Sequence, residues 1–132
     1  MKLKLFLIGL VTITLLTLPA CTSVPKQVSV DDSYSGKEVK IGAGGTLTVT
    51  LLSNQTTGFQ WALKEISDAT LLQKVDSKYE ASTTGLIGAG GKEIWTFNAL
   101  KDGKTTISME YSRPWEGGEK AASTFNLSIV IK

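Results

Sequence analysis

Few residues in this sequence could carry out chemistry. The chain contains no histidine, so Ser-His-Asp and Cys-His nucleophilic arrangements and the usual zinc sites cannot form. The nearest approach to a catalytic acid/base pair is Asp31-Asp32, or Glu116 with Glu119. Because these carboxylates stand in a polar segment and a glycine-rich turn, solvated charge is the better interpretation. We therefore expect a protein that is not an enzyme and that holds no cofactor and no metal.

Two glycine-rich runs share the pentapeptide Ile-Gly-Ala-Gly-Gly, at residues 41–45 and 87–91. Lys92 follows the second run, as a lysine does in a phosphate-binding loop. However, Glu93 stands where Ser or Thr is required, and the residues that follow resemble a strand rather than a helix. Each run taken alone therefore indicates either a hairpin loop or a binding loop whose bare backbone a partner can approach.

The first 21 residues have the pattern of an export signal. Lys2 and Lys4 precede an apolar run at residues 5–18, and Leu-Pro-Ala then stands directly before Cys21, the only cysteine. The pattern resembles a bacterial lipoprotein signal, and the apolar run is shorter than the roughly 18 to 20 residues of a spanning helix. We expect residues 1–21 to be a signal peptide with Cys21 lipidated, which places the protein on a membrane of the cell envelope, at its periplasmic or extracellular face. An ordinary cleaved signal is the alternative.

The chain that follows the signal is formally neutral. Without the two lysines of the signal, the 14 Lys and Arg residues become 12, which equals the 12 Asp and Glu residues. No basic cluster remains, so we expect no nucleic-acid partner. Residues 22–35 are poor in large apolar side chains and predict a flexible tether, although Val28 and Val30 could begin an edge strand instead. Residues 36–132 suffice for one domain with one core, which we expect to be monomeric.

Alternating apolar and polar residues predict strands in the rest of the chain. The alternation is strong in four segments, residues 47–51, 95–99, 107–111 and 125–131, and weaker in three, residues 38–41, 60–64 and 71–79. Turn signals rich in glycine, asparagine and aspartate separate these segments. About seven to eight short strands without a long helix predict an all-β protein, an immunoglobulin-like antiparallel β-sandwich, with Trp61 in its core.

Three turns of such a sandwich are expected at one end. Counting residues 46–52 as the second strand, the turns after the second, fourth and sixth strands are residues 54–59, 84–91 and 112–119. The first turn has two β-branched threonines, which are stiff, followed by Gly58, which permits a positive backbone angle. It should form a fixed protrusion.

The third turn contains Arg113-Pro114-Trp115. An arginine and a tryptophan beside a rigid proline are typical of an interface anchor, since Trp and Arg dominate binding hot spots. The alternative is that Trp115 caps the end of the sandwich while Arg113 pairs with Glu116 or Glu119.

Together, these segments resemble the chagasin family of cysteine peptidase inhibitors. The family's loops read N-P-T-T-G-[FY], G-x-G-G and R-P-[WF], and this sequence has, in the same order, Asn54-Gln55-Thr56-Thr57-Gly58-Phe59, Gly88-Ala89-Gly90-Gly91 and Arg113-Pro114-Trp115. The similarity extends from about Val39 to Ile131. Gln55 departs from the family by replacing a proline, which frees one backbone torsion and predicts a less rigid loop with weaker binding.

The resemblance implies a reversible, tight-binding inhibitor of papain-like cysteine peptidases that occludes the active-site cleft with three loops and performs no chemistry. The first loop would enter the cleft, the glycine loop would pair on one flank through its main chain, and the third loop would grip the other flank. The peptidase-binding residues that it implies are Asn54, Thr56, Thr57, Gly58, Phe59, Gly88, Ala89, Gly90, Gly91, Arg113, Pro114 and Trp115. The alternative is a non-inhibitory immunoglobulin-like envelope lipoprotein for adhesion or assembly.

Overall fold

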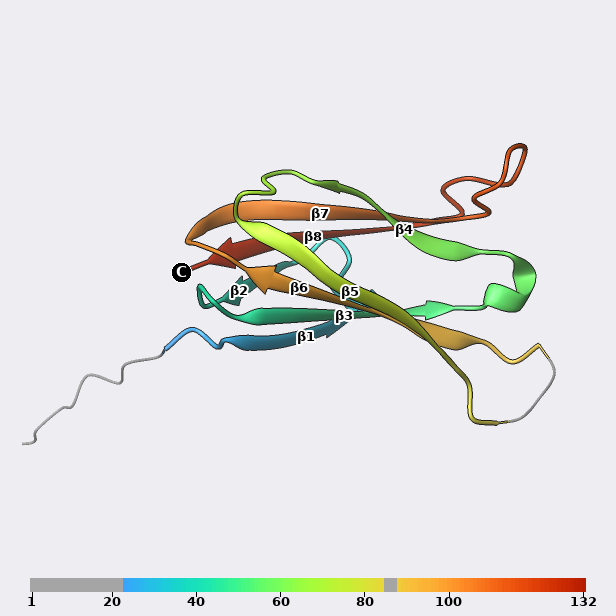
Figure 1. The fold of residues 1–132 in the computed structure, drawn as a ribbon, viewed down its shortest axis with the longest axis horizontal. Coiled ribbons are helices and arrows are strands. Elements are labelled where there is room, and N and C mark those ends of the chain that lie inside the picture. The colour runs from blue at the N-terminus through green and yellow to red at the C-terminus, as the bar shows by residue number, and fades with distance from the viewer. Residues whose placement is uncertain (1–22, 85–87) are drawn as a thin grey trace, which may run out of the picture.

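The computed structural model describes residues 23–84 and 88–132, so the predicted signal peptide with Cys21 lies outside the described part. Within it, the chain forms eight strands and two short 3-10 helices (Figure 1). In chain order they are β1 (Gln27–Asp31), η1 (Asp32–Tyr34), β2 (Glu38–Ile41), β3 (Thr46–Ser53), η2 (Gln55–Thr57), β4 (Gln60–Ile66), β5 (Leu72–Ala81), β6 (Gly91–Ala99), β7 (Gly103–Ser112) and β8 (Ser123–Ile131).

The strands form two four-stranded sheets that face each other. One sheet has the order β1-β3-β6-β5 and the other the order β2-β8-β7-β4 (Figure 1). The predicted all-β, immunoglobulin-like sandwich is therefore confirmed. The pairing is antiparallel except at two edges, where β1 runs parallel to β3 and β2 runs parallel to β8. These two short strands follow each other through η1, and each joins a different sheet.

The alternation seen in the sequence is what builds the core. Along β3, Leu47, Val49 and Leu51 are fully buried while the threonines between them are half-exposed. β6, β7 and β8 alternate in the same way, so that one face of each sheet is apolar and the two faces close on each other. The core consists of Val30, Val39, Ile41, Leu47, Val49, Leu51, Trp61, Leu71, Leu72, Trp95, Phe97, Ala99, Ile107, Met109, Phe125, Leu127, Ile129 and Ile131.

The folded domain begins earlier than predicted. Residues 27–31 form β1, which pairs with β3 from Gln27 opposite Thr46 to Asp31 opposite Thr50. Val30 is 5% exposed and belongs to the core. The prediction of a tether that extends to residue 35 is therefore wrong, and the edge strand that Val28 and Val30 suggested is present. At the end of β1, hydrogen bonds from the Ser33 hydroxyl and backbone N–H lower the pKa of Asp31.

Six of the seven connections between strands lie at two ends of the sandwich; the seventh, residues 32–37, passes from β1 in one sheet to β2 in the other. One end, here called the loop end, carries the first loop (residues 54–59), the second loop (residues 82–90) and the third loop (residues 113–122). The other end, the terminal end, carries three shorter connections and both ends of the described chain (Figure 1). Within the described residues no helix is long and apolar enough to cross a membrane.

Candidate functional site

The first loop is a single closed turn. Residues 55–57 form the 3-10 helix η2, capped at its start by Asn54, whose Oδ1 accepts hydrogen bonds from the N–H (3.2 Å) and the hydroxyl of Thr56. The Thr57 hydroxyl donates to the Asn54 carbonyl at 2.6 Å. Gly58 ends the turn with φ 83°, a left-handed conformation that favours glycine. Both threonine hydroxyls are thus satisfied inside the turn, and the side chains of Thr56 and Thr57 are exposed at its tip.

A column of aromatic rings supports this turn. The Phe59 ring stacks on Tyr111 with centroids 5.2 Å apart, and Tyr111 in turn contacts Trp61 at 5.1 Å. Tyr111 Oη accepts the Asn54 backbone N–H at 2.8 Å, and Trp61 Nε1 donates to the Leu52 carbonyl at 2.9 Å. Trp61 is 7% exposed and belongs to the core, as predicted. The first loop therefore stands on a stack of rings that continues into the sandwich.

The second loop is tied to the first by Asn54. The Asn54 side-chain amide donates to the Gly88 carbonyl at 3.1 Å, while its oxygen caps η2. Gly88 has φ 77°, again the left-handed region. Gly91 is the first residue of β6, where a Cβ would lie 2.7 Å from the Tyr79 hydroxyl. Gly88 and Gly90 are therefore exposed loop residues, whereas Gly91 belongs to the base of the loop; Ala89 is half-buried, and residues 85–87 lie outside the described part.

The third loop is tied to the first by Arg113. Its Nε donates to the Thr57 carbonyl at 3.1 Å, and its guanidinium lies over the Phe59 ring, 4.4 Å from the centroid. Stacking of this kind is a cation–π contact. Among the ion pairs of the described residues, none joins Arg113 to Glu116 or Glu119. The structure thus differs from the alternative in which Arg113 pairs with these glutamates, because its guanidinium is occupied by the first loop.

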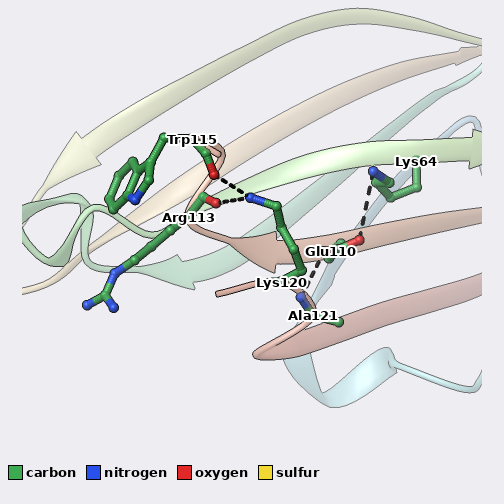
Figure 2. Close-up of polar contacts among 6 residues, drawn as sticks. All are labelled: Lys64, Glu110, Arg113, Trp115, Lys120 and Ala121. Atoms are coloured by element: carbon green, nitrogen blue, oxygen red, sulfur yellow. Dashed lines mark hydrogen bonds and ion pairs between the residues drawn. The ribbon is translucent and has the colours of Figure 1, made fainter. Parts of the chain in front are cut away.

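Trp115 contacts the first loop at its glycine. A Cβ added to Gly58 would overlap the Trp115 indole, at 2.9 Å from Cζ3 and closer still to Cη2. The indole is 52% exposed, so it covers Gly58 with part of its surface and presents the rest to solvent. Figure 2 shows Trp115 and Arg113 side by side, both projecting from the same limb of the third loop. Pro114 between them is exposed.

The three loops therefore form one surface, with the first loop between the other two. The tip of the first loop carries no ionisable side chain that could act as a general base. The Thr56 and Thr57 hydroxyls donate to oxygens of Asn54, which is not a base that could activate them as nucleophiles. No group of three or more potential metal ligands occurs in the described part of the chain. What the surface offers a partner is exposed backbone, threonine side chains, an arginine and a half-exposed indole.

Two residues of this surface were not predicted from the sequence. Tyr111 holds the first loop through its ring and its hydroxyl, and its place in the alternating pattern directly before the third loop was the available signal. Lys120 donates to the carbonyls of Arg113 and Trp115 (Figure 2). It stands in an irregular loop, where no periodicity points to any residue.

Comparisons with known proteins agree with the family resemblance of the three loop sequences. The family model "Chagasin family peptidase inhibitor I42" matches residues 31–129. The chain is similar to Amoebiasin-2 of Entamoeba histolytica, with 27% identity over 113 residues that make up 85% of this chain and 92% of that protein. It is 28% identical to Chagasin of Trypanosoma cruzi over 104 residues, 76% of this chain and 94% of the relative.

A solved structure shows the same fold. The crystal structure of the cysteine protease inhibitor EhICP2 from Entamoeba histolytica matches with a TM-score of 0.71 and 24% identity, over 82% of this chain and 99% of that one. The fold is therefore shared between sequences that differ at about three quarters of the matched positions.

Proposed function

This chain belongs to the chagasin family of peptidase inhibitors, and from that premise we propose that it inhibits papain-like cysteine peptidases reversibly and tightly. Its function is inhibition, not catalysis. The observation that carries the proposal is the junction of the three loops, in which Arg113 and Trp115 of the third loop and Asn54 of the first hold all three in one surface.

The first loop is suited to block an active-site cleft without being cleaved. Its backbone is wound into a hydrogen-bonded 3-10 turn, with Thr57 N–H donating to the Asn54 carbonyl and Gly58 N–H to the Gln55 carbonyl. A peptidase attacks a peptide bond that is presented in a defined near-attack geometry. A closed turn lying across the cleft fills the space without offering that geometry. The loop would therefore inhibit the peptidase by occupying its active-site cleft.

The flanking loops supply area and anchoring. Gly88 and Gly90 are exposed and have no side chain, so a partner's main chain can approach theirs and pair with it as a strand does. On the other flank, Trp115 offers the exposed half of its indole, the kind of surface that becomes a hot spot once desolvated. Protease–inhibitor interfaces bury about 1,600 Å² in total, and we expect all three loops to contribute to that area.

Rigidity is what makes these contacts tight. An interface loses affinity when loops must be ordered on binding, at about 0.5–1.5 kcal/mol for each immobilised side chain. Here the cap of η2, the aromatic column and the Arg113 contacts exist before a partner arrives. Gln55, which replaces the family's proline, stands at the first position of η2, and the Asn54 cap closes the turn around it.

The protein is tested as an inhibitor by titrating residues 22–132, which contain every strand of the described sandwich, against papain. We expect stoichiometric loss of peptidase activity, and recovery of activity on dilution because binding is reversible. Full papain activity in the presence of a large excess of the folded domain would overturn the proposal. It would leave the alternative of an envelope domain for adhesion or assembly.

We further propose that the inhibitor is a monomer held on a membrane of the cell envelope by a lipid on Cys21. Strands β4 and β5 are each the edge strand of one sheet. Each carries a register shift, between Leu63 and Glu65 in β4 and between Lys74 and Asp76 in β5. Bulges of this kind disfavour edge-to-edge pairing. Incorporation of a labelled fatty acid, lost in the Cys21→Ala variant, tests the anchor.

The place where the chain enters the sandwich suits such an anchor. Pro25 accepts a hydrogen bond from Gly42 N–H and Lys26 from Thr46 N–H, both at the terminal end. β3 then runs eight residues from Thr46 to Ser53, which at about 3.3 Å per residue puts the first loop roughly 25 Å further from the attachment point. A lipid at Cys21 would therefore leave the loops facing away from the membrane.

A further inference from the structure

The third loop is long, and a lysine side chain links its two limbs. The loop runs ten residues between β7 and β8. Lys120, on the returning limb, donates from Nζ to the Trp115 carbonyl at 2.8 Å and also to the Arg113 carbonyl, both on the outgoing limb (Figure 2). An ammonium group has three donors, and two of them are used to join one limb to the other.

The two carbonyls belong to the residues that contact the first loop. Arg113 donates to Thr57, and the Trp115 indole covers Gly58. The Trp115 carbonyl also accepts the Gly118 N–H at 3.0 Å, which closes the tip of the loop. Lys120 therefore fixes the backbone from which both contacting side chains project.

The backbone beside Lys120 is held by contacts with β7 and β4. The next residue, Ala121, has φ 51°, a left-handed conformation that is uncommon for a residue other than glycine. Its N–H donates to Glu110 Oε1 at 2.8 Å, and Glu110 pairs with Lys64 at 3.8 Å (Figure 2). A backbone in a sparsely populated conformation persists where its surroundings determine it. This bend at Ala121 accompanies the path of the Lys120 side chain across the loop to the outgoing limb.

Lys120 takes part in no ion pair among the described residues, although Glu116 and Glu119 lie in the same loop. Its charge is directed to backbone carbonyls instead. A hydrogen bond from a charged donor is stronger than one between neutral groups.

From these contacts we propose that Lys120 is a positioning residue of the inhibitor: its ammonium holds Arg113 and Trp115 in the conformation that meets the peptidase. The inference rests on the proposed inhibitory function. The inference goes beyond that function by assigning a positioning role to a residue that does not form part of the loop motifs. Lys120 acts through the third loop and not by attracting the enzyme.

The test compares Lys120→Met, which removes the ammonium and keeps an unbranched apolar side chain, with Lys120→Arg, which keeps the positive charge and supplies N–H donors. Lys101→Met is the matched control, because Lys101 is an exposed lysine at the terminal end. Association and dissociation rates with papain are measured at low and high salt. For Lys120→Met we expect dissociation to be about tenfold faster, association to change less than about twofold, and the effect to persist at high salt. Lys120→Arg should recover most of the affinity, and Lys101→Met should match the wild type.

A second measurement needs no peptidase. In the free Lys120→Met protein, backbone heteronuclear NOE values of residues 113–119 should fall, whereas those of residues 54–59 should change less. Two results would overturn the proposal: an inhibition constant of Lys120→Met within about twofold of wild type, or weaker inhibition with an unchanged third loop, which would indicate direct contact with the enzyme. If the wild type fails to inhibit papain, the proposed function fails instead, and the NOE values still decide whether Lys120 orders the loop.

Discussion

The two ends of the sandwich hold their connections together in different ways. At the terminal end, separate segments are joined backbone to backbone: Ala43 N–H donates to the Lys132 carbonyl at 2.9 Å, Gly44 N–H to Ala99 at 2.8 Å, and Leu100 N–H to Leu71 at 2.8 Å. At the loop end, the backbone–backbone hydrogen bonds of the described loop residues stay within one loop and the strands that flank it. There the contacts between loops are made by side chains, those of Asn54, Arg113 and Trp115.

This difference explains why one end is a closed scaffold and the other a binding surface. Backbone-to-backbone contacts consume the donors and acceptors of the main chain and depend little on the side chains. Side-chain contacts leave main-chain groups of the loops for a partner, but they require particular residues at particular places. The comparison therefore predicts that substitutions at the loop end change inhibition more than stability, and that substitutions at the terminal end do the reverse.

The largest effect on inhibition is expected from Gly58→Ala. The residue has φ 83°, which costs an alanine about 1–2 kcal/mol, and its Cβ would overlap the Trp115 indole. We expect the free variant loop to relax away from this conformation, so that the strain has to be restored on binding. Displacing a hot-spot tryptophan costs about 2 kcal/mol more, so the inhibition constant for papain should rise by about a hundredfold or more. An inhibition constant within about threefold of wild type, in a protein with a normal circular dichroism spectrum, would show that the contact between the first and third loops is dispensable.

A smaller loss is expected from Trp115→Ala, which removes the indole and leaves the first loop unstrained. Truncation of a hot-spot tryptophan costs about 2 kcal/mol or more, which is roughly thirtyfold in the inhibition constant. Leu100→Ala is the control, because Leu100 is an apolar side chain of similar exposure, 47% against 52%, at the terminal end. Equal inhibition by the two variants would remove Trp115 from the interface.

The smallest effect on inhibition, with the clearest effect on stability, is expected from Gly103→Ala at the terminal end. Gly103 has φ 147°, and a Cβ there would lie 2.7 Å from Cδ1 of Leu71, a core residue. Overpacking of this kind costs about 1–3 kcal/mol, which should lower the melting temperature by several degrees. The inhibition constant should stay within about twofold of wild type at temperatures where the variant is folded. A large rise in that constant would mean that the two ends are coupled through the sandwich.

Much of the fold follows from the sequence because it depends on a pattern that many residues share. Alternation over segments such as residues 47–51 and 125–131 leaves each strand with one apolar face, and two such faces have to close on each other. Once the strands were placed, their order put three particular turns at one end. The contact between Trp115 and Gly58 could not be predicted from these patterns, because it depends on the path of a loop and not on its composition.

Two features were left open or missed for physical reasons: β1, which was predicted only as an alternative to a tether, and Lys120. β1 buries only Val30 fully, so its segment lacks the apolar density that marks a strand, and its place is decided by pairing with β3. Lys120 acts through a local bend in which Ala121 has a positive φ, a conformation that the identity of an alanine does not indicate. Where single side chains determine a loop, sequence patterns carry little information about it.

The position of the termini has a practical consequence. Lys132, the last residue, bonds to Ile41 at the end where the chain also enters the sandwich, and both points lie behind the loops. A bead, a fluorophore or a carrier protein joined at Lys132, or just ahead of Pro25 in the domain that begins at residue 22, would therefore leave the three loops facing solution. The same molecule can then be immobilised as an affinity matrix for peptidases without redesign of its surface.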